Sequence, residues 1–438
     1  MPGFLLPDLN VLDLLYDRAP FISYGNSIWK NCYETIANIN NVLNYEEKNR
    51  SVIAPVVDSL VRGEMLGLRA LLHFDLLRMF GKGNLGNRRE LLNTFTIPYS
   101  LDFNKYAPAQ VTYEQFLYYL KKDIEEAIEY LYVDPITRRE PLSYYQPYVD
   151  QAFLATDEYN RGIIDRNFRM NYYAAQALYA RILMWEGTPE AKGKALTVAE
   201  DLIENAYYSW AYENSVMVKN NEWWKSDLLF KNEHLFTIAV EKLEEYQTHT
   251  QGTRNWFDAS SPGNTYQVVY LNQSKAEEIY ESPGIGDSDW RFIYCLLPQG
   301  QSRSYYGLVK LRQHPEHTAD YSRMIPMIRI TEMYYIAAEC RMEAGPDYDK
   351  SKALDYLNTV RRHRGIAQAE ELPASLTDAE VKEEIYKEYR KEFVGEGQIF
   401  FYYKRKGMET IPGYNGEMTD LQYQYPMPDD EIALGGRI

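Results

Sequence analysis

The chain has 438 residues, and its 47 Lys and Arg against 63 Asp and Glu give a formal net charge of −16 at pH 7. A surface that binds nucleic acid or anionic lipid needs the opposite sign, so both of these partner classes are discounted. The chain is long for a domain with one compact core, because single cores stop growing beyond a certain chain length. A stack of helical repeats is not subject to this size limit, because each repeat contacts only its neighbours.

The N-terminal part is predicted to be helical. Residues 26–47 carry apolar side chains on one face, and residues 55–80 are apolar around nearly the whole circumference, so we expect the second helix to be buried between neighbours. Residues 81–86 spell G-x-G-x-x-G, but a dinucleotide fingerprint follows a strand and precedes a helix. We therefore interpret this stretch as a helix stop and a loop.

Further helix starts follow. Thr112 to Gln115 is a capping box before a helix with an apolar stripe. Residues 169–187 are rich in alanine and predict a closely packed helix, and Thr188-Pro189 begins its partner as a cap with a first-turn proline. These helical pairs resemble tetratricopeptide units without the consensus Trp and Gly positions. We expect degenerate repeats.

The helical period disappears between residues 206 and 324. Short alternating runs at 235–241 and 266–272 predict strands. About 120 structureless residues would be anomalous for a connection, so we expect an irregular subdomain or a functional surface laid on the helices. Five of the seven tryptophans lie here, namely Trp210, Trp223, Trp224, Trp256 and Trp290.

The helical period returns in residues 325–407. A first helix is predicted over 326–344, a second over 349–364, and a third after the capping box that begins at Thr377. The predicted fold class is therefore mainly α, with tetratricopeptide-like helical repeats and an irregular, aromatic-rich subdomain that carries a few short strands.

Other features of the sequence argue against particular sites. Cys32, Cys295 and Cys340 are odd in number and far apart, which argues against a disulfide framework or a zinc site. His314-Pro315-Glu316-His317 is the one close histidine pair, and its proline disfavours a helical metal site. We expect no metal and no cofactor. No run approaches the ~18 to 20 apolar residues of a spanning helix, and the first residues lack the pattern of a signal peptide.

Several blocks of the sequence resemble the SusD/RagB family of surface glycan-binding lipoproteins. They are Ile325 to Cys340, Leu357 to Gly365, Glu388 to Gly397, Gly63 to Gly81, and the ending around Tyr425 to Pro428. Ile399 and Tyr402 depart from the family pattern, which commonly has Arg and Asp there. The family also usually has a longer N-terminal part.

The resemblance implies a domain organisation and a location. Residues 1–438 would form one SusD-like unit, with 26–205 and 325–407 as the helical scaffold and 206–324 as the irregular, ligand-facing subdomain. The family is made with a secretion signal and a lipidated N-terminal cysteine, which would place the protein on the outer membrane, facing the exterior. Neither is visible in the sequence, and we interpret the chain as trimmed.

The resemblance also implies a function. The protein would capture a glycan and deliver it to a SusC-like TonB-dependent transporter, without being an enzyme. Stacking on an indole or phenol ring buries the apolar face of a sugar, and neighbouring polar side chains take its hydroxyls. Arg254, Asn255, Trp256 and Asp258 offer these groups together. The predicted ligand-binding residues are these four with Tyr266, Trp290, Trp223 and Trp224.

Two alternatives remain open at this point. One is an all-helical glycoside hydrolase, which needs two acids in one cleft. Pairs such as Asp287 with Asp289 and Glu244 with Glu245 are plentiful in an acidic chain, and we expect most of them to be solvated. The other is a helical-repeat scaffold that binds a peptide or protein. For any single tryptophan, packing of the subdomain onto the helices competes with a ligand-binding role. The identity of the glycan is not determined by the sequence.

Overall fold

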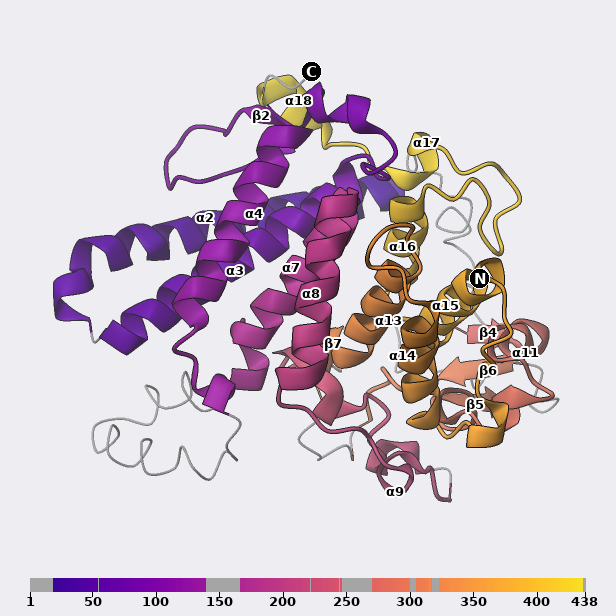
Figure 1. Cartoon of the computed structure of the whole chain (residues 1–438). Helices are drawn as coiled ribbons and strands as arrows, with labels where there is room; N and C mark the ends of the chain where they lie inside the picture. Colours follow the sequence, from indigo (N-terminus) through magenta and orange to yellow (C-terminus); the bar gives the residue numbers. More distant parts are fainter. Residues whose placement is uncertain are drawn as a thin grey trace. The chain divides into compact units, whose positions relative to one another are not determined.

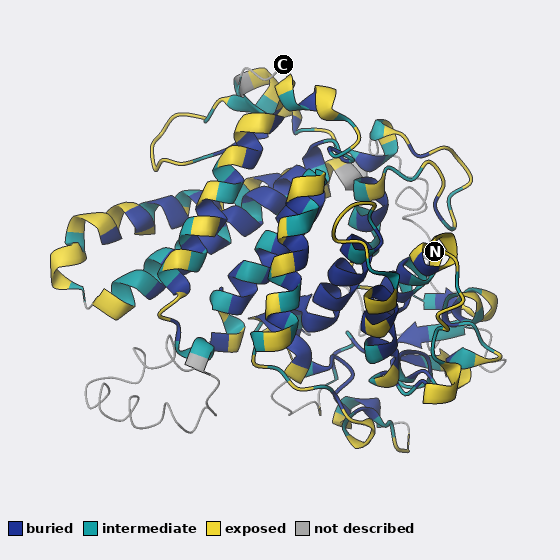
Figure 2. Ribbon diagram, viewed as in Figure 1, coloured by how far each residue is buried: buried dark blue, intermediate teal, exposed yellow. Residues whose placement is uncertain are grey.

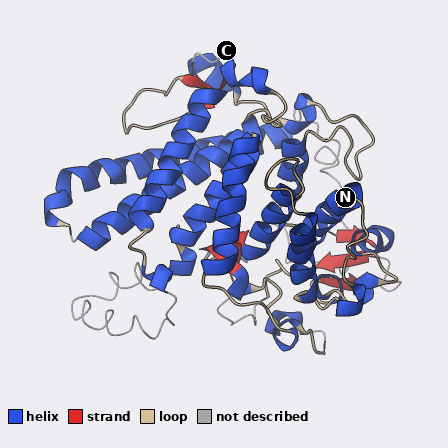
Figure 3. Cartoon of the chain, in the orientation of Figure 1, coloured by secondary structure: helices blue, strands red, loops and turns tan. Residues whose placement is uncertain are grey.

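The computed structural model describes residues 19–53, 55–138, 166–220, 222–243, 245, 270–299, 305–314, 316 and 323–435. Within these ranges the fold is mainly helical with a few short strands, which confirms the predicted fold class (Figure 3). The described residues fall into two compact units. The N-terminal unit holds residues 19–207, 404–409 and 418–435, and the C-terminal unit holds residues 208–403 and 410–417.

Helices that follow each other along the chain pack together in the N-terminal unit (Figure 1): α2 against α3, α3 against α4, α4 against α7, and α7 against α8. This stacking of sequence neighbours is the arrangement expected of helical repeats. The helices are α2 (Ala19–Asn49), α3 (Pro55–Phe80), α4 (Tyr113–Leu131), α7 (Tyr172–Glu186), α8 (Pro189–Asn205), α17 (Asp420–Tyr423) and α18 (Asp429–Gly435). Short 3₁₀ helices are η1 (Arg50–Val52), η2 (Arg89–Asn93), η3 (Pro135–Arg138) and η4 (Arg166–Phe168).

The predicted helix starts of this unit are confirmed by their hydrogen bonds. The Thr112 hydroxyl accepts from the Gln115 backbone N–H, and the Gln115 side chain accepts from the Thr112 N–H, which completes the capping box. Thr188 caps α8 by accepting from the Ala191 N–H. Most of α3 is buried, as its continuous apolar surface predicts. Helix α2 extends beyond the predicted 26–47 at both ends.

A two-stranded antiparallel hairpin links α3 to α4. It pairs β1 (Phe95–Pro98) with β2 (Gln110–Thr112), and residues 99–109 form the loop between them. Residues 81–86 lie in a turn and loop after α3, as interpreted from the sequence.

The C-terminal unit combines three packed helices with short elements. Helix α13 packs against α14, and both pack against α15. The helices are α9 (Glu213–Val216), α11 (Gln273–Tyr280), α12 (Trp290–Ile293), α13 (Ile330–Arg341), α14 (Lys350–Arg362) and α15 (Asp378–Glu392), and α16 (Gln398–Lys406) begins in this unit. The 3₁₀ helices are η5 (Trp223–Lys225), η6 (Lys231–Glu233), η7 (Ile285–Asp287) and η8 (Gln368–Glu370).

Two small antiparallel sheets complete the C-terminal unit. One pairs β3 (His234–Ala239) with β7 (Met324–Arg329), and the other has the order β4-β6-β5, from β4 (Tyr270–Asn272), β6 (Tyr305–Leu308) and β5 (Leu296–Gln299). Strand β3 confirms the strand predicted at 235–241. Residues 266–269 of the other predicted strand lie outside the described residues.

The predicted helix at 326–344 was wrong in its first turn. Residues up to Arg329 belong to β7, where Pro326 pairs with Thr237 and Ile328 pairs with Phe236, so α13 begins only at Ile330. The partner strand lies about 90 residues earlier in the chain, and a local apolar pattern carries no information about such a pairing. The other two helices of this region lie where they were predicted, with Asp349 capping α14 and Thr377 capping α15.

Buried residues form stripes on the packed sides of the helices, with exposed residues on the opposite sides (Figure 2). In the part of the chain that the structure describes, none of the helices is both long and apolar enough to span a bilayer. The predicted scaffold residues 325–407 fall largely in the same unit as the predicted irregular subdomain. The assignment of scaffold and ligand-facing roles to these ranges stays a prediction.

Candidate ligand-binding region

The predicted ligand-binding residues divide into two groups. Arg254, Asn255, Trp256, Asp258 and Tyr266 lie outside the described residues, so their role stays a prediction. Trp223, Trp224 and Trp290 are described, and the structure brings all three to one hydrophobic cluster of the C-terminal unit.

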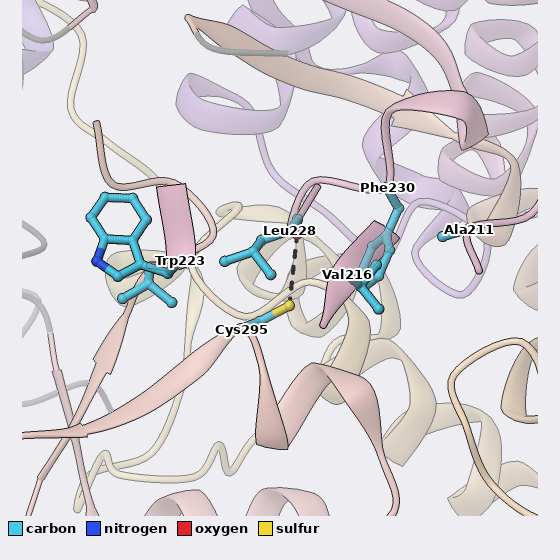
Figure 4. Packing of buried hydrophobic residues seen from close by; sticks show 7 residues of the cluster. Ala211, Val216, Trp223, Leu228, Phe230 and Cys295 are labelled. Carbon is cyan, nitrogen blue, oxygen red and sulfur yellow. Dashed lines mark hydrogen bonds between the residues drawn. The ribbon is translucent and has the colours of Figure 1, made fainter. Parts of the chain in front are cut away.

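This cluster is one of the apolar clusters of the irregular region (Figure 4), and a second one includes Tyr280 and Phe292. The buried members of the first cluster are Ala211, Val216, Trp223, Leu228, Phe230, Cys295 and Val309. The Cys295 thiol points toward the Leu228 carbonyl, with a sulfur–oxygen distance of 3.7 Å. Burial raises the pKa of Cys295 to about 12, so the thiol is protonated and packs as a small apolar group. The irregular region therefore has an apolar core of its own.

Trp223 is a member of that core. Its side chain is only 6% exposed, and the Arg312 guanidinium lies 5.2 Å from the centre of its ring. Trp224 and His314 each meet it edge to face. The ring of Trp223 is therefore packed into the cluster, and its predicted ligand-binding role stays a prediction.

Trp224 is half-buried at the margin of the cluster. Its ring stacks on His314, with the centroids 3.9 Å apart and an interplanar angle of 5°. The Glu316 backbone N–H donates to His314 Nδ1 at 3.1 Å, which leaves the imidazole proton on Nε2 in the neutral ring. Sequence reasoning considered His314 only as a metal ligand and missed this stack, because its partner lies 90 residues earlier in the chain.

Trp290 lies at the same margin, also half-buried, and is locked to the end of α14. Its backbone N–H donates to the Arg364 carbonyl at 2.8 Å. Its indole lies so close to Gly365 that a Cβ on that residue would come within 2.3 Å of Nε1. Gly365 also has a φ of +86°, which favours glycine. A tryptophan of the irregular region is thus joined to one of the sequence blocks that carry the family resemblance.

A network of buried charges lies in the same unit. Glu392 accepts from Arg364 at 2.7 Å and from Arg291 at 3.1 Å, and it also pairs with Arg329. Glu388 accepts from Arg291 at 2.9 Å. All of these side chains are at most 2% exposed. A carboxylate buried this deeply is stable only when its charge is compensated, and here three guanidinium groups surround Glu392.

The surrounding positive charges keep the carboxyl groups of Glu388 and Glu392 ionised. Burial by itself raises the pKa of a carboxyl, but Arg291, Lys391 and Arg361 outweigh it and lower the pKa of Glu388 to about 2. Burial acts on Glu392 in the same sense, and Arg364 and its neighbours bring its pKa well below the usual value. Neither carboxylate therefore has a proton to give near neutral pH.

Two acids weighed in the sequence have different environments. Asp289 is completely buried and paired with Arg291 at 2.7 Å, so the expectation that it is solvated was wrong. Asp287 is exposed and accepts from the Ser282 hydroxyl and the Gly284 N–H. Glu244 lies outside the described residues. Within the ranges that the structure describes, no group of three His, Cys, Asp or Glu side chains is arranged to hold a metal ion.

Two family models match the sequence. One is described as the SusD family and matches residues 297–434, and the other is described as "Starch-binding associating with outer membrane" and matches residues 4–140. All five blocks that carried the resemblance fall inside these two ranges. A search among curated proteins finds no match.

Solved structures share the fold. A SusD superfamily protein from Bacteroides vulgatus ATCC 8482 is 23% identical, with a TM-score of 0.67 over 94% of this chain and 84% of that one. Surface glycan-binding protein A from Bacteroides uniformis is 19% identical, with a TM-score of 0.64 over 94% and 84%. A SusD superfamily protein from Bacteroides thetaiotaomicron VPI-5482 is 16% identical, with a TM-score of 0.69 over 99% and 88%.

Proposed function

The chain belongs to the SusD/RagB family, and from this premise we propose that it is a non-enzymatic glycan-binding protein of the outer-membrane surface. It captures an oligosaccharide or polysaccharide and delivers it to a SusC-like TonB-dependent transporter. Attachment to the membrane through a lipid is part of the proposal, and no nucleic acid is involved. One matching family model describes starch-binding proteins that associate with the outer membrane, and one structural neighbour is a surface glycan-binding protein.

The observation that carries the proposal is the gathering of tryptophans at one cluster of the C-terminal unit. Trp223 closes the core, while Trp224 and Trp290 pack against it and stay half-buried. Half-buried indoles suit sugar recognition, because one part of the ring is held by the protein and the other meets the apolar face of a pyranose. We place the glycan at Trp224, Trp290 and the aromatic segment 254–266.

Glu388 and Glu392 do not supply the proton-donating acid of a glycosidase. A glycosidase needs one carboxyl with a raised pKa that can donate a proton and a second carboxylate on the other side of the bond. Glu388 and Glu392 are ionised, enclosed by arginines and inaccessible to a substrate. Their role is to hold α15 to its neighbours.

A glycan array followed by calorimetry on the purified chain tests the function. We expect saturable binding to at least one glycan and no release of product on prolonged incubation. Appearance of shortened oligosaccharides would replace the proposal with the glycoside hydrolase alternative. Binding to peptides in the absence of any glycan ligand would favour a helical-repeat peptide binder.

Trp256→Ala is the first variant to test within this site. Removal of an aromatic platform is expected to weaken glycan binding by roughly 1 to 3 kcal/mol, by analogy with aromatic anchors at interfaces, with little change in melting temperature. Trp256→Phe keeps a ring and should retain most of the affinity. A lowered melting temperature with intact affinity would show that Trp256 is a core residue, as Trp223 is.

A further inference from the structure

The base of the loop between β1 and β2 is hydrogen-bonded by side chains of α2 and α3, of which Asn40 and His73 are buried. The Asn40 carboxamide donates to the carbonyls of Ser100 and Asp102, at 3.2 and 3.3 Å. The Ser100 N–H donates to Nε2 of His73 at 2.9 Å, and the Tyr33 hydroxyl donates to the Pro98 carbonyl at 2.7 Å. Four backbone groups of residues 98–102 are therefore bound by side chains of α2 and α3.

A second set of contacts fixes the side chains that hold the loop. Arg69 donates to both oxygens of Asp123, at 2.7 and 2.6 Å, and to the Asn40 carboxamide oxygen at 2.8 Å. The Tyr99 hydroxyl donates to Asp123 at 2.6 Å, and its ring stacks on His73 with the centroids 3.8 Å apart. These five side chains are all at most 7% exposed.

The protonation state of His73 agrees with this geometry. Its Nδ1 lies 2.9 Å from the Arg69 carbonyl, to which it donates, and its Nε2 accepts from Ser100. Burial lowers the pKa of His73 to about 3, so the ring is neutral and the acceptor nitrogen stays free of a proton. Buried polar groups that are fully paired favour one conformation, because each alternative leaves a donor or acceptor unpaired. The base of the loop is therefore rigid.

The residues above this base are exposed and largely apolar. Leu101 is 39% exposed, Phe103 51% and Tyr106 74%. Polar side chains alternate with them, at Asp102, Asn104 and Lys105. Asn104 stabilises the turn by accepting from the Tyr106 N–H at 2.8 Å, and the Lys105 ammonium lies 5.5 Å from the centre of the Tyr106 ring.

We propose that residues 101–107, which we call the 101–107 loop, form a second carbohydrate-contact site, in the N-terminal unit. The proposal rests on the glycan-binding function above. Phe103 and Tyr106 provide rings for the apolar faces of sugars, and Asp102, Asn104 and Lys105 provide partners for hydroxyls. The buried base presents these groups without the ordering cost that a mobile loop would pay on binding.

Two other occupants fit the loop less well. A stable protein interface buries about 800 Å² and involves roughly 20–30 residues on each side, which seven loop residues do not supply. An anionic lipid surface attracts clusters of basic residues. The loop carries one lysine and one aspartate, and the chain has a net charge of −16. A few sugar units match the size and the balanced charge of the loop.

A second site has a measurable consequence for long ligands. A polysaccharide that is bound at one site and reaches the 101–107 loop with another part of its chain gains avidity, because the second contact forms at high effective concentration. An oligosaccharide too short to engage both gains nothing. The 101–107 loop should therefore matter for polymers and not for short fragments.

The test uses the full chain and native affinity gels that contain amylopectin, dextran, xylan, arabinogalactan or mannan. The Phe103→Ala/Tyr106→Ala double variant is compared with the wild type and with Tyr45→Ala/Tyr132→Ala. The control removes two tyrosines of the same unit that are 70% and 71% exposed but lie outside the loop. Calorimetry with a trisaccharide of the same polymer measures the short ligand, and thermal unfolding checks that each variant is folded.

We expect the double variant to bind the retained polysaccharide at least about fivefold more weakly, with the control variant and the trisaccharide affinity unchanged. Equal retention of the double variant and the wild type would overturn the second site and leave the proposed function intact. Failure of the wild type to bind any of the polymers or their fragments would overturn both. An equal loss in the Tyr45/Tyr132 control would also overturn it, because surface tyrosines in general would then be responsible.

Discussion

Single residues decide how the irregular region joins the helices, and Gly365 is the clearest case. Its φ of +86° and its contact with the Trp290 indole both exclude a side chain. Gly397 is a matched position, because its φ is +74° but no atom lies within 4 Å of the place that a Cβ would take. Comparison of alanine variants at the two positions therefore distinguishes the cost of backbone strain from the cost of steric overlap between a Cβ and the Trp290 indole.

Gly365→Ala is expected to destabilise the C-terminal unit more than Gly397→Ala does. Strain at a positive φ costs roughly 1–3 kcal/mol in either variant. Only Gly365→Ala also displaces Trp290, which adds an overpacking cost of about 1–3 kcal/mol. Thermal or urea unfolding of the two variants measures the difference. Equal destabilisation would mean that Trp290 moves aside at no cost.

Asp227 is a residue whose titration should be visible in stability. Its carboxylate is 7% exposed and accepts from the Lys231 N–H with both oxygens, at 3.2 and 3.1 Å. Burial raises its pKa from 3.8 to about 6. The folded state therefore binds a proton that the unfolded state has lost between these two pH values, so the free energy of unfolding falls as pH rises through this window.

Asp227→Asn should remove this pH dependence. The difference in unfolding free energy between wild type and variant is expected to change by on the order of 3 kcal/mol between pH 4 and pH 6.5, with the wild type losing stability as pH rises. Denaturant titrations at several pH values measure it. Asp287→Asn is the control, because the pKa of this exposed carboxyl is lowered and its titration lies below the window. Parallel curves for wild type and Asp227→Asn would contradict the assignment.

At the scale of elements, the buried charges join segments that are far apart in the chain. Glu392 at the end of α15 meets Arg291 of α12, Arg329 of β7 and Arg364 just after α14. Arg364 also pairs with Glu233, the last residue of η6, at 2.5 Å. The block Glu388 to Gly397, which carries part of the family resemblance, is thus a structural junction.

Glu392→Gln should destabilise the C-terminal unit strongly. The variant leaves three buried guanidinium groups short of a counter-charge, and breaking a buried pair in this way typically costs about 3–5 kcal/mol. Chemical unfolding at low and high salt measures the loss, which should persist at high salt because buried pairs are little screened. Glu278→Gln is the control, since its pair with Lys275 is partly exposed and should contribute at most about 1 kcal/mol. A loss no larger than that of the control would show that the network is not needed for stability.

At the scale of the whole molecule, the helical repeats and the irregular region suit different partners. A stack of repeats presents a broad rigid face, whereas loops supply adaptable contacts. We therefore expect the transporter to bind the helical scaffold and the glycan to bind the loops. This division extends the proposed function and remains a prediction.

Cross-linking of the protein to its transporter tests the division of surfaces. Cross-links are expected on the repeat helices α2, α3, α4, α7 and α8, and few between Trp210 and Trp290. The same experiment with bound polysaccharide should leave the pattern unchanged, because the two partners use different surfaces. Cross-links that map mainly to the segment from Trp210 to Trp290 would contradict the prediction that the transporter binds the helical scaffold.

The sequence by itself determined the helices, because their signals are local. The capping boxes at Thr112 and Thr377 and the apolar circumference of α3 each act within a few turns, and all three lie where they were predicted. The family blocks likewise identified the fold. Among the predicted site residues, Trp223, Trp224 and Trp290 share one cluster, while Trp256 lies outside the described residues.

Only the tertiary structure decided how deeply those tryptophans are buried and which side chains they contact. Trp223 and Trp224 are adjacent in sequence and are the same residue type. Trp223 is nevertheless buried and contacts Arg312, whereas Trp224 is half-buried and stacks on His314. The residues predicted as the first turn of α13 form the end of β7 in the structure. Asp289, which was expected to be solvated, forms a buried ion pair with Arg291. In each case the deciding partner is distant in sequence or belongs to a network with distant members. Burial and charge compensation depend on such partners, and a local pattern does not contain them.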